Sequence, residues 1–132
     1  MRTSTIRRQH ENTSIPELCG TCCSAFKAVI HEQDKRLGLL YIQLSGVWHR
    51  FFLDAGLLFW EEGRCPDPDD DVLEGERYID LGETLHVIGV SIQRIEMRDS
   101  TLTLQFENSA SLALRNGVRE VGSEVVESIA GR

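Results

Sequence analysis

The chain has 132 residues, a length that fits one domain with a substantial apolar core. It contains 14 Lys and Arg and 21 Asp and Glu, and eight of these acids but only one of the bases, Arg64, fall in residues 61–76. That segment therefore carries the whole formal charge of −7, because the remaining 13 acids and 13 bases cancel. Such a charge distribution argues against nucleic-acid binding, which needs a basic surface.

Residues 1–14 are polar and show no periodicity. This composition predicts a flexible N-terminal tail ahead of a single β domain over residues 15–132. No apolar stretch has the length of a signal-sequence core or of a membrane span. We therefore expect no membrane partner and a cytoplasmic location, in which the four cysteines stay reduced.

The first part of the domain reads as a short turn followed by two strands. Ser14 and Glu17 have the spacing of a capping box, which predicts a helical turn. Residues 22–32 alternate between apolar and polar side chains, although a helical spacing of apolar residues is also present. We favour a strand because a polar turn leads directly into a second strand candidate at residues 39–44.

Residues 46–63 hold five of the nine aromatic residues, in two apolar runs separated by Asp54-Ala55-Gly56. Two such runs around a short glycine turn predict a β-hairpin. A three-residue loop with Gly56 in the left-handed region would pair Phe51 with Phe59 and Arg50 with Trp60. Because side chains alternate between faces, one face would hold Phe51, Leu53, Leu57 and Phe59, and the other Trp48, Arg50, Phe52, Leu58 and Trp60.

The clearest strand pattern lies in residues 101–106, where apolar side chains occupy every even position. This alternation predicts a strand with one solvent-facing side. A two-residue turn at residues 99–100 then pairs Met97 with Leu102, so that apolar side chains share a face. Upstream, the apolar positions change from odd to even, which predicts a β-bulge near residues 93–94.

Downstream of this strand, a three-residue loop at residues 108–110 is expected to pair Phe106 with Leu112. Residues 118–129 fit either a short C-terminal helix or a last strand around Glu124–Ile129. Short strands joined by hairpins predict an all-β, mainly antiparallel fold. We expect a small β-sandwich or barrel made of two successive meanders.

Residues 63–77 form an acidic loop that is long for a compact domain, and such loops are usually functional or disordered. A local negative field steers a basic partner, and Trp and Arg side chains dominate contact hot spots. We therefore expect a non-catalytic module, of the immunity-protein or adaptor type, that binds a basic protein and needs no cofactor. The predicted partner-binding residues are Asp67, Asp69, Asp70, Asp71, Glu74, Glu61, Glu62, Trp60, Trp48 and Arg50.

Two other functions compete with this interpretation. A small-molecule binder would use a pocket inside the β-barrel lined by Tyr41, Phe51 and Phe59. A zinc or thiol protein would use the cysteines, with ligands drawn from Cys19, Cys22, Cys23, Cys65, His31 and His49. The chain has one C-x-x-C where strong zinc signatures have two, so we expect free, metal-free cysteines. No known catalytic motif is present, so we expect no enzyme.

Overall fold

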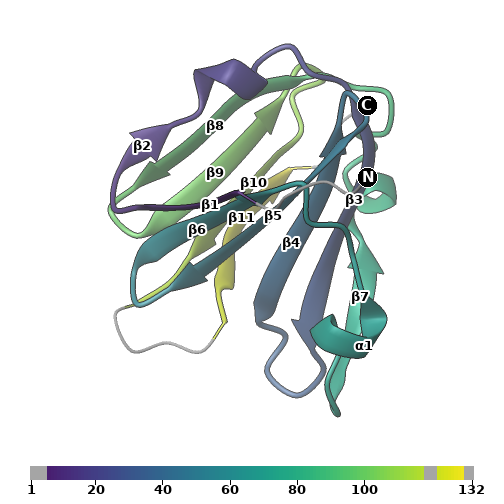
Figure 1. Ribbon diagram of the computed structural model, residues 1–132, viewed down its shortest axis with the longest axis vertical. Coiled ribbons are helices and arrows are strands. Elements are labelled where there is room, and N and C mark those ends of the chain that lie inside the picture. The colour runs from purple at the N-terminus through teal and green to yellow at the C-terminus, as the bar shows by residue number, and fades with distance from the viewer. Residues whose placement is uncertain (1–5, 118–121, 130–132) are drawn as a thin grey trace.

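The computed structural model describes residues 6–117 and 122–129, which fold into two antiparallel sheets (Figure 1). The six-stranded sheet has the order β1-β6-β5-β4-β3-β7, and the five-stranded sheet has the order β11-β10-β9-β8-β2. Apolar side chains from both sheets pack into one core. The all-β, mainly antiparallel class predicted from the sequence is therefore confirmed.

The six-stranded sheet contains β1 (Ile6–His10), β3 (Cys23–His31), β4 (Leu37–Leu44), β5 (Val47–Asp54), β6 (Leu57–Glu62) and β7 (Glu76–Asp80). The five-stranded sheet contains β2 (Thr13–Ser14), β8 (Ile92–Arg98), β9 (Thr101–Phe106), β10 (Ser111–Arg115) and β11 (Glu124–Ile129). Three single helical turns complete the described elements: η1 (Pro16–Leu18), α1 (Pro68–Asp71) and α2 (Leu81–Thr84).

The two meanders, predicted for residues 39–60 and 89–114, are β4–β6 in the first sheet and β8–β10 in the second, and β3 and β11 extend them by one strand each. The flexible tail predicted for residues 1–14 is wrong where the structure describes it, because β1 pairs with β6 and β2 pairs with β8. Both strands cover a sheet edge whose backbone groups would otherwise lack partners. Residues 1–5 lie outside the described part of the chain.

Both ambiguous segments form strands. The predicted strand at residues 22–32 is β3, and the C-terminal segment forms the strand β11 rather than a helix, although residues 118–121 lie outside the described part. The predicted turn near Ser14 exists as η1, but its N-cap position is Ile15 and no side chain caps it. Ser14 instead pairs with Glu96 in β2, so the capping box does not form.

The second meander largely follows the predicted register. Met97 pairs with Leu102 across a two-residue turn, and the register shifts between Ile92 and Arg94, as the predicted bulge requires. The next hairpin differs by two residues, because Leu112 pairs with Leu104 rather than with Phe106. Its three-residue loop begins one position earlier than predicted, and Ser109 adopts the left-handed conformation. Even positions still face the core.

The β5–β6 hairpin departs from the prediction by one residue. Ala55 and Gly56 form a two-residue turn with φ of 52° and 79°, the turn whose twist matches that of paired strands. Phe51 therefore pairs with Trp60, and Phe52 with Phe59. Two predicted faces are thereby corrected: Phe51, Leu53, Leu58 and Trp60 belong to the core, whereas Trp48, Arg50, Phe52, Leu57 and Phe59 lie on the outer face of the sheet.

Phe106 tests the packing between the two sheets. Its side chain is fully buried, and its ring centre lies 5.9 Å from that of Phe26 in the opposite sheet. The substitution Phe106→Ala should lower the free energy of unfolding by about 3–5 kcal/mol, because it removes a large buried ring and leaves a cavity. Urea unfolding measures this change, with the outward-facing Thr103→Ala as a control. A loss below about 1 kcal/mol would contradict the packing.

Candidate functional site

The acidic segment, residues 61–76, folds against the outer face of the six-stranded sheet. The chain leaves β6, crosses to α1 and returns as β7 beside β3 (Figure 1). Val29 of β3 and Tyr41 of β4 are buried although neither belongs to the core cluster between the sheets. The acidic segment therefore covers the outer face of β3 and β4, and it does not extend freely into solvent.

The segment has a local structure of its own, which corrects the expectation of an irregular loop. Asp67 is the N-cap of α1, and its side chain accepts a hydrogen bond from the Asp69 backbone N–H at 3.2 Å. Pro68 occupies the first helical turn, where its missing N–H and fixed φ are tolerated. This Asp-Pro start is a sequence signal that could have predicted the turn.

Asp71 fixes the end of this turn to the sheet. Its carboxylate is buried and accepts hydrogen bonds from the Tyr41 hydroxyl at 2.7 Å, the Tyr78 hydroxyl at 2.7 Å and the Asp67 backbone N–H at 2.8 Å. A guanidinium nitrogen of Arg50 lies 3.9 Å away. We call Tyr41, Arg50, Asp71 and Tyr78 the Asp71 cluster. Sequence reasoning had grouped Asp71 with its exposed neighbours, and the structure assigns it a structural role.

The two tyrosines of the cluster act as hydrogen-bond donors at neutral pH. Burial, together with donation to the Asp71 carboxylate, raises the pKa of Tyr41 to about 12. The same two causes, burial first, raise the pKa of Tyr78. Both hydroxyls therefore remain protonated well above neutral pH, which suits a permanent connection between the acidic segment and the sheet.

Arg50 joins this cluster to the neighbouring strand and ring. It forms an ion pair with Glu61, its cross-strand partner on β6, and its side chain is largely buried. Its guanidinium carbon lies 5.4 Å from the centre of the Phe52 ring. The predicted pairing of Arg50 with Trp60 is therefore wrong. Arg50 and Glu61 neutralise each other, and both side chains are largely buried, so neither is an exposed contact group.

Trp60, predicted as an exposed anchor, belongs to the core. Its indole N–H donates to Nδ1 of His49 at 3.1 Å, and Arg8 of β1 lies over the ring at 4.3 Å. Burial lowers the pKa of His49, which keeps the imidazole neutral and able to accept this bond. Trp48 is half-buried on the outer face and meets Tyr41 edge-on, with ring centres 6.5 Å apart.

The remaining predicted residues lie at the surface. Glu62 is half-buried, 3.6 Å from Arg8, and Asp70 is 3.5 Å from Arg64. Four acids of the segment are exposed: Asp67, Asp69, Asp70 and Glu74. We call these four residues the exposed acids. They are the part of the predicted site that a partner could reach directly.

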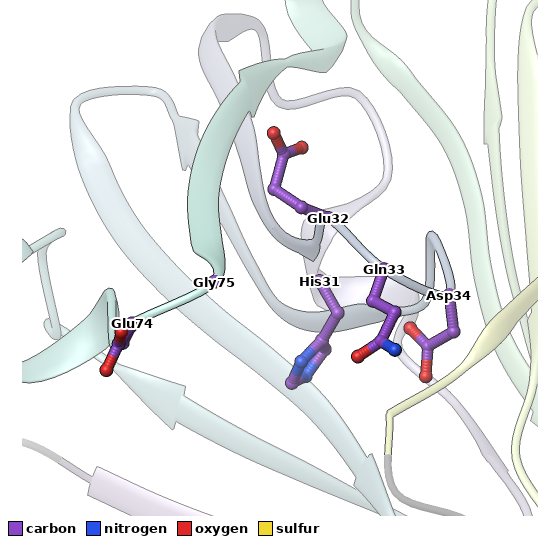
Figure 2. A pocket seen from close by; sticks show the side chains of 6 residues that line it. All are labelled: His31, Glu32, Gln33, Asp34, Glu74 and Gly75. Atoms are coloured by element: carbon purple, nitrogen blue, oxygen red, sulfur yellow. The ribbon is translucent and has the colours of Figure 1, made fainter.

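The acidic surface continues into a cavity of about 340 Å³ between the β3–β4 turn and the start of β7. Its lining includes Glu32, Asp34 and Glu74, and Figure 2 shows His31, Gln33 and Asp34 pointing to one side while Glu32 points to the other. Sequence reasoning missed Glu32 and Asp34. They lie far from residues 61–76 in sequence, and only the pairing of β3 with β7 brings them close.

Phe52 lies on the same face as Trp48 and Arg50, as predicted, whereas Phe59 was predicted on the opposite face. The two rings lie on the outer face as a cross-strand pair, almost parallel and 4.9 Å apart, and both are half-buried. Their apolar character was visible in the sequence. The outward position of Phe59 was not, because it depends on the length of the β5–β6 turn.

The competing sites find little support in the geometry. Tyr41 and Phe51 lie on opposite faces of the six-stranded sheet, so the predicted small-molecule pocket with Phe59 does not form. Cys19, Cys22 and Cys65 are exposed free thiols, and burial raises the pKa of Cys23 to about 11. Within residues 6–117 and 122–129, no three His, Cys, Asp or Glu side chains are grouped to hold a metal ion.

Comparisons with protein-family models, with curated proteins and with solved structures gave no significant match. None of the helical turns in the described part of the chain has the length or apolarity needed to cross a membrane.

The Asp71 cluster predicts a strong difference between neighbouring acids. Asp71→Ala leaves the buried Tyr41 hydroxyl and the half-buried Tyr78 hydroxyl without their acceptor. An unsatisfied buried group costs about 1–3 kcal/mol, so unfolding should become easier by at least about 1 kcal/mol. Asp69→Ala, two residues away and exposed, should change stability by less than about 0.5 kcal/mol. Chemical denaturation of both variants tests this. Equal effects would contradict the role of Asp71.

The raised pKa of Tyr41 predicts alkaline destabilisation. An unfolded tyrosine titrates near about 10, whereas Tyr41 in the folded chain titrates near about 12, so the unfolded state loses its proton first. The stability contribution is complete below about pH 10 and is lost as the pH rises towards about 12. Tyr41 and Tyr78 are the chain's two tyrosines, so phenolate absorbance reports on the cluster alone.

In the urea-unfolded chain we expect phenolate absorbance to appear at about pH 10. In the folded protein the absorbance should appear only at higher pH, towards about 12 for Tyr41. Tyr41→Phe should be less stable at neutral pH, because Asp71 loses a donor, and should lose less stability on alkalinisation. Titration of both tyrosines near pH 10 without unfolding would contradict the arrangement.

Proposed function

We propose that this chain is a non-catalytic binding module, of the immunity-protein or adaptor type, that recognises a basic protein through the exposed acids. The observation that carries this proposal is the anchoring of Asp71 by Tyr41, Tyr78 and Arg50. It holds the neighbouring exposed acids in a fixed place on the sheet. A fixed acidic surface offers a partner a defined geometry, which a mobile acidic tail does not.

The distribution of charge supports a basic partner. Net negative charge is confined to residues 61–76, and the exposed acids concentrate it on one part of the surface. Such a field raises the association rate of an oppositely charged protein by about 10–1000-fold at low salt. At physiological ionic strength the Debye length is about 8 Å, so the effect is strong only where the partner approaches this surface.

Preorganisation supports the same conclusion. Ordering a flexible segment during binding costs free energy, which lowers affinity. The Asp67 cap and the Asp71 cluster order this segment in the free protein. The fold therefore already compensates for the repulsion among neighbouring carboxylates. A basic partner would reduce that repulsion further when it binds.

An association experiment tests the proposal with a partner captured from the native cell. The variant Asp69→Asn, Asp70→Asn, Glu74→Gln removes three exposed charges and keeps Asp67 and Asp71 in place. Its association rate should be lower than that of the unmodified chain at low salt and should depend less on salt. Its melting temperature should stay unchanged or rise slightly, because repulsion decreases.

The matched control removes three exposed charges elsewhere, with Glu83→Gln, Glu107→Gln and Glu127→Gln. This control has the same net charge as the first variant and should bind at nearly the rate of the unmodified chain. If the two variants bind alike at every salt concentration, the position of the exposed acids has no role and the proposal is wrong.

A further inference from the structure

The outer face of the six-stranded sheet has an apolar area that the acidic segment does not cover. It consists of the Phe52–Phe59 pair and two leucines. Leu39 lies on β4, the strand next to that of Phe52, and Leu57 lies two residues before Phe59 on β6. All four side chains are half-buried, whereas Val29 and Tyr41 on the same face are fully covered. We call these four residues the aromatic patch.

The aromatic patch adjoins the acidic segment directly. One guanidinium group, that of Arg50, lies 5.4 Å from the Phe52 ring centre and 3.9 Å from the Asp71 carboxylate. Asp71 ends the helical turn that carries Asp69 and Asp70. At the other end of the patch, Leu57 pairs with the exposed Asp54. The patch therefore has Asp54 at one end and, beyond Arg50, the helical turn of the acidic segment at the other.

The positive charge within this area is already neutralised. Arg50 is paired with Glu61 and lies near Asp71, and its side chain is only 12% exposed. A partner that contacts the patch therefore meets an apolar surface bordered by carboxylates. Its complement is an apolar side chain bordered by Lys or Arg.

We propose that the aromatic patch is the anchor site for the partner, and that it binds an apolar side chain flanked by basic residues. This inference rests on the proposed function, since the exposed acids bind the flanking charges. Charge gives encounter rate and orientation, and a desolvated apolar contact in the centre of an interface supplies most of the affinity. The two rings stack on each other, nearly parallel, so each supports the position of the other for that contact.

A second copy of this chain is the less suitable occupant. In a two-fold symmetric contact the same surface meets itself, so the exposed acids of one copy would approach those of the other. Like charges brought together in this way oppose association. The charge pattern therefore favours a different, basic protein.

The test uses short synthetic peptides as probes, because they separate charge from apolar contact. One peptide alternates lysine with leucine, a second alternates lysine with serine, and a third alternates serine with leucine. Binding to the full chain is measured by fluorescence anisotropy at physiological ionic strength. We expect the lysine–leucine peptide to bind at least about tenfold more tightly than either of the others, because only it offers both groups.

The double variant Phe52→Ser, Phe59→Ser should remove this tenfold advantage and keep the weak binding of the lysine–serine peptide. The variant Phe52→Leu, Phe59→Leu retains an apolar surface and should retain most of the advantage. If the double serine variant unfolds, the single variants Phe52→Ser and Phe59→Ser take its place, and each should reduce the advantage of the lysine–leucine peptide over the lysine–serine peptide.

Each other outcome overturns a different statement. Equal affinity for the two lysine peptides, or an advantage that survives the serine variant, refutes the aromatic patch as anchor and leaves the proposed function intact. Binding of the serine–leucine peptide as tight as that of the lysine–leucine peptide, or no binding that depends on the exposed acids, refutes the proposed function as well. Self-association that disappears in the serine variant assigns the patch to a second copy.

Discussion

A buried carboxylate is tolerated only where several hydrogen-bond donors surround it. The outer face of the six-stranded sheet provides such donors for Asp71. Removing an ionised carboxylate from water costs several kcal/mol unless hydrogen bonds and opposite charge replace the lost hydration. The hydrogen-bond donors come from β4, β7 and the acidic segment itself, and the opposite charge comes from Arg50 on β5. The position of the whole segment therefore depends on strands that are distant in sequence but adjacent in the fold.

This requirement separates the acids of residues 61–76 into two groups with opposite roles. Glu61 and Asp71 are buried and have lost most of their long-range field, because Arg50 and the two tyrosines compensate them. The exposed acids retain their field, since water screens but does not neutralise them. The segment has a formal charge of −7, but the charge that it presents at the surface is smaller. The buried Asp71 holds the exposed acids in position.

Much of the fold followed from the sequence wherever one side of a strand was clearly polar. The alternation in β9 determined which residues face the core, and that parity correctly placed the bulge near Arg94 and the turn before Leu102. The exact register of the following hairpin did not follow, because parity allows a shift of two residues. The sequence alone indicated where the candidate site lies, but not which of its acids are buried and which are exposed.

The division could not be predicted because its signals are not local. Nothing in the sequence around Asp71 distinguishes it from Asp69 and Asp70, and its partners Tyr41 and Tyr78 lie in strands that read as ordinary. The Asp-Pro start of α1 was the one local signal available. It indicates a helical turn but not which side of that turn is buried.

The composition of the proposed partner surface depends on one further non-local contact. Leu57, Leu58, Phe59 and Trp60 are all apolar, so parity cannot decide which of them face the core. A three-residue turn would have exposed Trp60, and the two-residue turn exposes Phe59 instead. Asn116, sixty residues away, accepts a hydrogen bond from the Gly56 backbone N–H at 2.7 Å and so helps to hold that shorter turn.

A side chain on Gly56 would also approach Ser100 Oγ to 2.9 Å, so the turn packs closely against the second sheet. The contact between the two sheets therefore selects which aromatic residues reach the surface. A stacked Phe pair on the outer face replaces the Trp60 that the sequence placed there, and the proposed anchor site is therefore made of Phe52 and Phe59 rather than of Trp60.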